Sequence, residues 1–277
     1  MAETLRRVLS VASSARLVEE NVAEAGSPVL LLGGPGSGKT TLLFAAALEA
    51  AGEGRGPVLF LTRRPLQSLP RRTGAALDPL RLQKIRFQYP PSTRDLLGLL
   101  CSAHEIRGPA PSLLLLDGLE EYLLEDPGSE DAAYLAALLL DTVAHFSRRV
   151  PGGCGLLVAL QTQEEGDNED VLQLFILRRY FPSQCWLHFE DQNPGQRLLR
   201  VSLEPGGLAP QEEWSVLFHP DGEMIVTPRT ALAGEPSADS ASCAGDQPCT
   251  SVCDRQSLLQ FLSAGKLTAG THTDPKP

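Results

Sequence analysis

The sequence has few aromatic residues, no excess of positive charge and no long apolar run. Aromatic side chains make up 5% of the 277 residues, so leucine, alanine and valine must supply the core of any folded domain. The formal net charge is -10, which excludes an overall basic nucleic-acid-binding surface and leaves only a local patch for such contacts. Apolar runs stay below the ~18 residues of a membrane-spanning helix, so we expect no membrane insertion.

The six cysteines give little sign of disulfides or of a metal site. The sequence contains Cys101, Cys154, Cys185, Cys243, Cys249 and Cys253. The first three stand singly among apolar residues, and the opening residues lack the pattern of a secretory signal, so we expect reduced core thiols. The last three are separated by five and three residues, with only His272 downstream, a spacing that fits unpaired thiols better than a zinc site.

Three parts of the chain differ in pattern. Residues 1–27 are expected to hold a short amphipathic helix, packed on the body or on a partner. Residues 28–229 alternate apolar strand-like runs with helical patterns, which predicts an α/β domain with a doubly wound, mostly parallel sheet. Residues 230–277 are rich in Ser, Ala, Gly, Pro and Asp, which is typical of a largely disordered tail. Short strands that end the sheet in antiparallel pairing are expected at 185–189, 197–203, 214–218 and 224–227.

One uninterrupted motif carries the strongest functional signal. It has the form G-x-x-x-x-G-K-[ST] and consists of Gly33, Gly34, Pro35, Gly36, Ser37, Gly38, Lys39 and Thr40. Its glycines let backbone N–H groups wrap around phosphate oxygens, Lys39 adds positive charge near the β- and γ-phosphates, and Thr40 offers a hydroxyl to Mg²⁺. An apolar strand precedes the motif, and the helix that continues through Thr41 presents its positive end to the phosphates. These flanks argue against a chance glycine-rich turn and predict binding of ATP with Mg²⁺.

Asp117 is the predicted metal-side acid. It ends the run Leu113–Leu116, so its carboxylate should emerge at the carboxyl edge of a buried strand, where open α/β sheets bind their ligands. There it would hold Mg²⁺ through a water molecule. The alternative is an ordinary strand-terminal aspartate in a turn with Gly118.

Several segments together resemble the RecA-like recombinases and their paralogues. Neither the N-K-x-D motif of GTPases, nor an ABC signature, nor the arginine-rich lid of small-molecule kinases is present. The resemblance covers residues 28–228 and lies in LLLLGGPGSGKTTLLFAAALEA, KIRFQYPPSTRDLLGLL, LLLLDGLEEYL, GLLVALQTQ and EWSVLFHPDGEM. It implies a RecA-like P-loop NTPase fold.

Three further segments narrow the resemblance. FLTRRPLQSLP, LDPLRLQKIRFQYPPSTRDLL and RRYFPSQCWL resemble the branch that associates with a SWIM zinc-finger protein in Shu-type recombination complexes. This resemblance implies a nuclear ATPase of DNA repair by homologous recombination, which forms a heterodimer with the SWIM protein and supports the recombinase. It also implies binding of DNA, expected to be single-stranded, and contacts with other RecA-like paralogues. The alternative is a nucleotide-binding scaffold that hydrolyses little ATP and holds its partners.

The sequence departs from the recombinases at the residue that activates the attacking water. The recombinases place a glutamate after the second strand, whereas here Arg63 and Arg64 follow that strand and stay protonated at neutral pH. Glu120 and Glu121 are candidate substitutes, or else solvated residues at a helix start. We therefore expect slow hydrolysis. Gln163, with Gln161 as the alternative, stands where the recombinases place the glutamine that senses the γ-phosphate; a plain surface amide is the other interpretation.

The segments that follow the metal and sensor strands read EDPGSED and EEGDNED, and both would repel DNA phosphates. A different segment is basic and holds the DNA-binding candidates Arg63, Arg64, Arg71, Arg72, Arg81, Lys84 and Arg86. The alternative is an arginine-rich surface that balances the acidic segments or contacts a partner. Phe44-Ala45-Ala46-Ala47 fits F-x-x-A, the hook between recombinase subunits, although its place inside a helix favours Phe44 as a core residue.

Overall fold

The computed structural model describes most of the chain up to residue 229. The described residues are 2–9, 27–52, 56–66, 71–72, 78–123, 129–162, 168–190, 197–207, 210–218 and 223–229. The predicted tail, its three cysteines and Gln163 lie outside them, as do residues 10–26 of the predicted N-terminal extension. No helix in the described part of the chain is long and apolar enough to cross a membrane.

The described strands form one sheet in the order β3-β10-β9-β8-β7-β1-β6-β5-β2-β4. Its parallel part holds β1 (Val29–Gly33), β2 (Val58–Thr62), β4 (Ile85–Gln88), β5 (Leu113–Asp117), β6 (Gly155–Gln161) and β7 (Ser183–Glu190). An antiparallel arm continues through β8 (Arg197–Glu204), β9 (Glu212–Phe218) and β10 (Glu223–Arg229), and the two-residue β3 (Arg71–Arg72) pairs with β10 in parallel. The predicted α/β class, with a mostly parallel sheet and antiparallel strands at its end, is confirmed.

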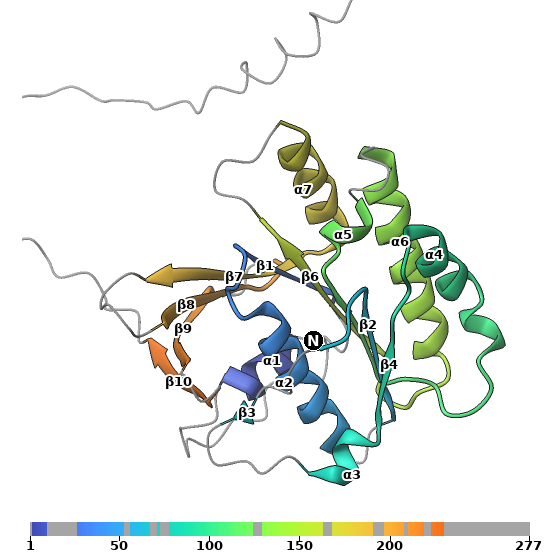
Figure 1. Cartoon of the computed structure of the whole chain (residues 1–277), viewed down its shortest axis with the longest axis horizontal. Helices are drawn as coiled ribbons and strands as arrows, with labels where there is room; N and C mark the ends of the chain where they lie inside the picture. The colour runs from blue at the N-terminus through green and yellow to red at the C-terminus, as the bar shows by residue number, and fades with distance from the viewer. Residues whose placement is uncertain are drawn as a thin grey trace, which may run out of the picture. The chain divides into compact units, whose positions relative to one another are not determined.

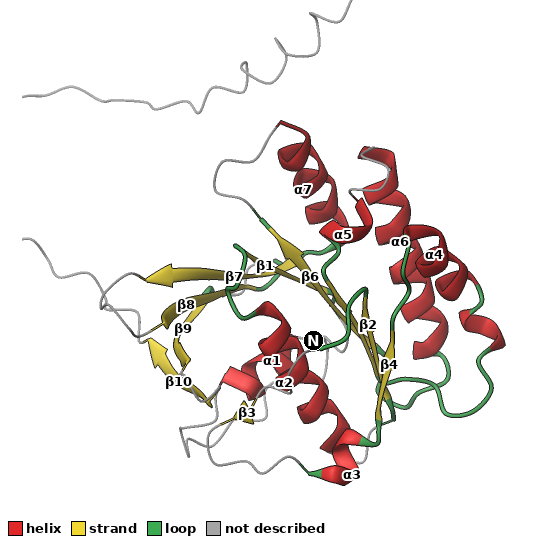
Figure 2. Cartoon of the chain, in the orientation of Figure 1, coloured by secondary structure: helices red, strands yellow, loops and turns green. Residues whose placement is uncertain are grey.

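Helices cover both faces of the parallel strands (Figures 1 and 2). One face carries α1 (Ala2–Leu9), α2 (Lys39–Gly52) and α3 (Pro79–Leu82). The other face carries α4 (Thr93–Cys101), α5 (Glu120–Leu123), α6 (Ser129–Ser147) and α7 (Asn168–Tyr180), with the short 3-10 turn η1 (Ala103–Glu105) after α4. Successive side chains of β1 point to opposite faces of the sheet. Leu31 packs with α2 on one face, while Leu30 and Leu32 pack with α4 and α6 on the other. The sheet is therefore doubly wound.

The described part of the N-terminal extension is the helix α1, which packs on the body. Leu5, Val8 and Leu9 are buried in the same cluster as α2, and Arg6 Nε donates to Glu212 Oε1 of β9 at 2.7 Å. The expectation that this helix packs on its own domain is confirmed for residues 2–9.

The expectation for the three isolated cysteines is confirmed at two positions and wrong at one. Cys154 and Cys185 are buried, and burial raises the pKa of each thiol to about 12, so both are inert at neutral pH. Cys101 is exposed, because it is the last residue of α4 and lies off the buried stripe of that helix, which contains Leu96 and Leu100.

Two features of the late sheet differ from expectation. Helix α7 lies between β6 and β7, where no element is expected from the pattern, because residues 171–177 are apolar at six of seven positions and show no amphipathic period. It provides the crossover that places β7 parallel to β1. The antiparallel arm consequently begins at β8, one strand later than predicted.

Candidate nucleotide-binding site

The loop between β1 and α2 is held in the shape that phosphate binding requires. Gly36 and Gly38 have φ angles of +70° and +81°, in the left-handed region that glycine adopts without strain. The helix starts at Lys39, so the first N–H groups of α2 have no intrahelical acceptor and are free to bind an anion. The curled backbone is therefore present in the chain itself.

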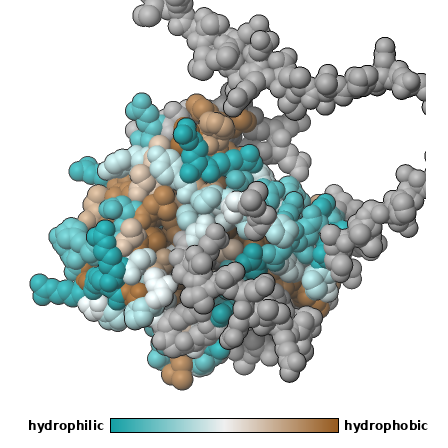
Figure 3. All heavy atoms as spheres, turned by 180° about the vertical axis from the view of Figure 1, so that it is seen from behind, coloured by the Kyte–Doolittle hydropathy of each residue, from teal (hydrophilic) through white to brown (hydrophobic). Residues whose placement is uncertain are grey.

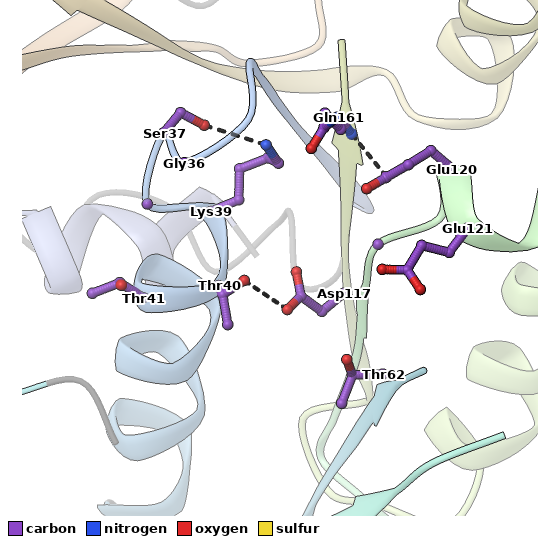
Figure 4. A pocket seen from close by; sticks show the side chains of 12 residues that line it. Gly36, Ser37, Lys39, Thr40, Thr41, Thr62, Asp117, Glu120, Glu121 and Gln161 are labelled. Carbon is purple, nitrogen blue, oxygen red and sulfur yellow. Dashed lines mark hydrogen bonds between the residues drawn. The ribbon is translucent and has the colours of Figure 1, made fainter. Parts of the chain in front are cut away.

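Lys39 places its ammonium group inside this loop. Its Nζ donates to the carbonyl oxygens of Gly33 and Gly34 at 2.8 and 2.7 Å, and to Ser37 Oγ at 3.3 Å. The side chain is largely buried, and this burial lowers the pKa of Lys39 while the negative charges of Glu120 and Asp117 oppose the shift. Lys39 is thus a positioned and weakly solvated cation at the centre of the site (Figure 4).

Thr40 and Asp117 come together from opposite sides of the cleft. Thr40 Oγ1 donates to Asp117 Oδ2 at 2.7 Å, which joins the start of α2 to the carboxyl end of β5 (Figure 4). Burial raises the pKa of Asp117, and the hydrogen bond from Thr40 and the charge of Lys39 counteract the rise. A hydroxyl beside a carboxylate is a set of hard oxygen ligands that suits Mg²⁺, so the residues present fit this ion.

Glu120 and Glu121 lie at the start of α5, and both line the cleft. Glu120 Oε2 accepts a hydrogen bond of 2.8 Å from the backbone N–H of Gln161, and burial raises the pKa of Glu120. Glu121 Oε2 lies 3.5 Å from Arg64 Nε and accepts no hydrogen bond among the described residues. Both glutamates therefore line the cleft, and the role of either as the base stays a prediction.

Gln161 is the glutamine that the structure places at the site. It is the last residue of β6, pairs with Gly33 of β1 and lines the cleft beside Glu120. Gln163, the first candidate for the sensor, lies outside the described residues.

The described residues of the basic segment lie at both edges of the sheet. Arg63 and Arg64 follow β2 at the carboxyl edge of the sheet, whereas Lys84 precedes β4 at the amino edge. Lys84 Nζ donates to Ala51 O at 3.1 Å, and Arg81 Nε lies 3.7 Å from Asp78 Oδ2. Arg86 is exposed on the edge strand β4, and the side chains of Arg71 and Arg72 are outside the described residues. A role of these residues in DNA binding stays a prediction.

The cleft has a volume of about 390 Å³. It is lined by Gly36, Ser37, Gly38, Lys39, Thr40, Thr41, Thr62, Asp117, Gly118, Glu120, Glu121 and Gln161. Gly33, Gly34 and Pro35 belong to the motif but do not line the cleft, and Gly33 and Gly34 act through their carbonyl oxygens on Lys39. The sequence pattern does not predict that Thr62 lines the cleft. Thr62 lies there because β2 pairs with β5 in a register that sets it opposite Asp117. Phe44 is fully buried in α2, as the core interpretation predicts.

The fold and this cleft define a RecA-like P-loop nucleotide-binding domain. Among solved structures, one described as an ATPase domain aligns with 73% of this chain and 85% of its own, at a TM-score of 0.52 and 11% identity, a likeness that concerns the fold alone. No family model matches the sequence.

Two curated relatives define the family. The chain is 69% identical over 226 residues to the human (Homo sapiens) protein ATPase SWSAP1, across 81% of this chain and 99% of that protein. It is 57% identical over 280 residues to ATPase SWSAP1 of the mouse (Mus musculus), across 100% of both chains. The chain therefore belongs to the SWSAP1 ATPase family.

Proposed function

We propose that this chain binds ATP with Mg²⁺ and hydrolyses it slowly, as the ATPase subunit of a homologous-recombination repair complex. The observation that supports this most directly is the convergence of Lys39, Thr40 and Asp117, with Thr40 Oγ1 2.7 Å from Asp117 Oδ2. Thr40 and Asp117 would hold Mg²⁺, which neutralises phosphate charge when bound. Lys39 would turn from the carbonyl oxygens of the loop toward the phosphates, and the N–H groups up to Thr41 would bind their oxygens.

The hydrolytic base is proposed to be one of the two glutamates at the start of α5. The position that holds a glutamate in the resembled recombinases is taken by Arg63 and Arg64, which supports a slow rate. Glu120 is held by the N–H of Gln161, whereas Glu121 Oε2 has an ion-pair contact but no hydrogen bond from any described residue. Turnover of Glu120→Gln and Glu121→Gln, compared with Lys39→Ala as the inactive reference, identifies the base. Unchanged turnover in both glutamine variants excludes both residues.

The resemblance of the segments FLTRRPLQSLP, LDPLRLQKIRFQYPPSTRDLL and RRYFPSQCWL supports the rest of the proposal. We propose a nuclear heterodimer with a SWIM zinc-finger protein that binds single-stranded DNA and supports the recombinase. Contacts with other RecA-like paralogues belong to the same proposal.

A nucleotide-binding scaffold is the second candidate, and the arginines after β2 favour it. Co-expression with the SWIM partner, followed by single-turnover hydrolysis with and without DNA, separates the two candidates. The ATPase proposal expects product formation that DNA changes and that Lys39→Ala abolishes. The scaffold expects nucleotide-dependent assembly of the complex, with hydrolysis no faster than in Lys39→Ala.

A further inference from the structure

The outer side of α7 and β7 carries a stacked group of three side chains. The rings of Trp186 and His188 lie 5.7 Å apart between centroids and are within 5° of parallel. The guanidinium carbon of Arg178 lies 5.4 Å from the centroid of the Trp186 ring. Trp186 is half-buried, whereas Arg178 and His188 are exposed. The group therefore presents the exposed His188 ring, backed by Trp186, and the Arg178 cation to solvent.

The arginines around this group differ in how their charge is used. Arg200, opposite His188 in the strand pairing, donates to Glu213 Oε1 at 2.6 Å, and Arg229 pairs with Glu190. Within the described part of the chain, Arg178 and Arg179 have no ion-pair partner, and both are exposed at the end of α7. Two positive charges are thus available to a ligand beside the stacked rings.

A third aromatic residue extends the same surface. Phe175 is 62% exposed and lies one helical turn before Arg178 and Arg179, on the same side of α7. In Figure 3, apolar residues gather at the top of the described body, where α7 lies in Figure 1. The surface therefore runs from Phe175 and Arg178 on α7 to the half-buried Trp186 and the exposed His188 on β7.

We infer that this surface, formed by Phe175, Arg178, Arg179, Trp186 and His188, binds single-stranded nucleic acid. Unpaired bases stack on aromatic rings whatever their sequence, and the two arginines match the charge of the phosphates between them. Duplex DNA cannot use the surface in this way, because its base faces are covered by neighbouring bases. The inference rests on the DNA-binding part of the proposed function and assigns it a site.

The unpaired arginines favour this surface over the basic segment, since they lie at the end of α7, whereas the acidic Glu169 and Asp170 lie in its first turn. In that segment Arg63, Arg81 and Lys84 already contact acceptors within the chain, and they lie at opposite edges of the sheet. Their charges are therefore partly satisfied within the chain itself. The surface on α7 and β7 instead combines unpaired cations with stacking partners on adjacent elements.

The experiment measures binding of the full chain to a fluorescein-labelled oligothymidine of about 30 nucleotides, longer than the ~4–16 nucleotides that one domain covers. Because Trp186 also packs against the core, His188→Ala is the primary variant, and Trp186→Phe keeps an aromatic ring at the second position. Arg178→Ala/Arg179→Ala removes the two charges. Its matched control is Arg107→Ala/Arg148→Ala, which removes two exposed arginines elsewhere on the surface.

His188→Ala should weaken binding about 5- to 150-fold at an unchanged salt dependence, as expected for loss of one base stack. Arg178→Ala/Arg179→Ala should lower the slope of log affinity against log salt by about 1.4, for two lost phosphate contacts. Trp186→Phe and the control pair should bind like wild type. The chain has two tryptophans, and binding should quench the fluorescence of the half-buried Trp186 but not that of the buried Trp214. The quenching should therefore persist in a Trp214→Phe variant.

Two results would overturn the inference. One contradicts this binding site alone, and the other also contradicts DNA binding by the chain. Wild type that binds the oligothymidine while every variant binds equally well overturns this site alone. In that case, loss of binding in Arg71→Ala/Arg72→Ala would assign the DNA contact to the basic segment. Wild type that binds no oligothymidine overturns the DNA-binding part of the proposed function together with the site, and would leave the surface to a protein partner.

Discussion

The aromatic ring of Phe218 lies directly against the backbone of Gly38. A Cβ atom on Gly38 would be 2.7 Å from Cζ of Phe218 and 2.9 Å from Cε2. Phe218 ends β9 in the antiparallel arm, and Gly38 lies in the phosphate loop, so the arm supports the loop from outside. A side chain at Gly38 is thus disfavoured by backbone conformation and would also displace the ring of Phe218.

Gly38→Ala should destabilise the protein and abolish ATP binding. An L-residue at φ +81° costs about 1–2 kcal/mol, and the contact with Phe218 adds to this cost. Adding Phe218→Ala to the Gly38→Ala variant should recover the stability lost through the contact with the ring. The stability lost through the backbone conformation should not be recovered. Urea unfolding measures the stability, and a shift of the unfolding midpoint on addition of Mg-ATP measures binding.

The control for this prediction is Gly98→Ala in the exposed part of α4. Apart from the neighbouring backbone of α4, no heavy atom of the described residues lies within 4 Å of the position of its Cβ, and glycine inside a helix costs about 0.5–1 kcal/mol relative to alanine. Gly98→Ala should therefore raise the free energy of unfolding and leave ATP binding unchanged. Equal effects of the two glycine substitutions would contradict the account of Gly38.

Lys39→Ala should remove the stabilisation that ATP confers. Wild type at an ATP concentration of about 100 times its Kd should gain about 2.7 kcal/mol of unfolding free energy. The variant loses the ammonium group that the loop positions, so the same ATP concentration should shift its unfolding midpoint little. Arg107→Ala serves as a control for the loss of one positive charge, since this arginine is exposed away from the cleft. A full ATP-induced shift in Lys39→Ala would contradict the assignment.

Without nucleotide, Asp117→Asn should make the free energy of unfolding less dependent on pH. The same variant should bind ATP without dependence on Mg²⁺. Burial raises the pKa of Asp117, so above the unfolded value of about 3.9 the folded state binds more protons than the unfolded state. Stability therefore falls as pH rises through the raised pKa. Glu120 contributes in the same direction, so the variant should keep part of the fall. Urea unfolding between about pH 4 and pH 7 tests this, and identical pH slopes in wild type and variant would contradict it.

Elements with a clear local signal could be predicted from the sequence. Val58–Thr62 and Leu113–Asp117 are short apolar runs between turn residues, and the structure has strands at these residues. Ser92 is the N-cap of α4, with its side chain accepting from the N–H of Asp95. The G-x-x-x-x-G-K-[ST] motif placed the cleft because its spacing alone defines the loop.

Features that depend on packing could not be predicted in this way. Helix α7 has apolar residues both on the side that packs against α6 and on the exposed side, at Val171, Leu172 and Phe175. Its sequence therefore shows no amphipathic stripe. Thr62 joins the cleft only because β2 pairs with β5 in the register that sets it opposite Asp117. The residues of the basic segment are close in sequence, which suggests one continuous patch. In the fold, Arg63 and Arg64 follow β2 at the carboxyl edge of the sheet, whereas Lys84 precedes β4 at the amino edge.

Arg63 and Arg64 both contact Glu121, yet their loss should have different effects. Arg63 Nη1 donates to the carbonyl oxygen of Glu121 at 2.7 Å in a partly buried setting, and such a charge-assisted bond contributes about 1.5–3 kcal/mol. Arg64 has a side chain that is 81% exposed and a longer contact of 3.5 Å, which contributes ~1 kcal/mol or less. Arg63→Ala should therefore lower the free energy of unfolding more than Arg64→Ala does, although each removes one charge.

The same pair tests how Glu121 acts in hydrolysis. If Glu121 is the base, Arg63→Ala should slow turnover at saturating ATP, because the backbone that aims the carboxylate loses its anchor. The apparent affinity for ATP should change little, since Arg63 does not line the cleft. Turnover that falls with Glu120→Gln and stays unchanged in both arginine variants would assign the base to Glu120, whose carboxylate is held by Gln161 instead. Unfolding in urea, measured on the same preparations, separates a loss of turnover from a loss of folded protein.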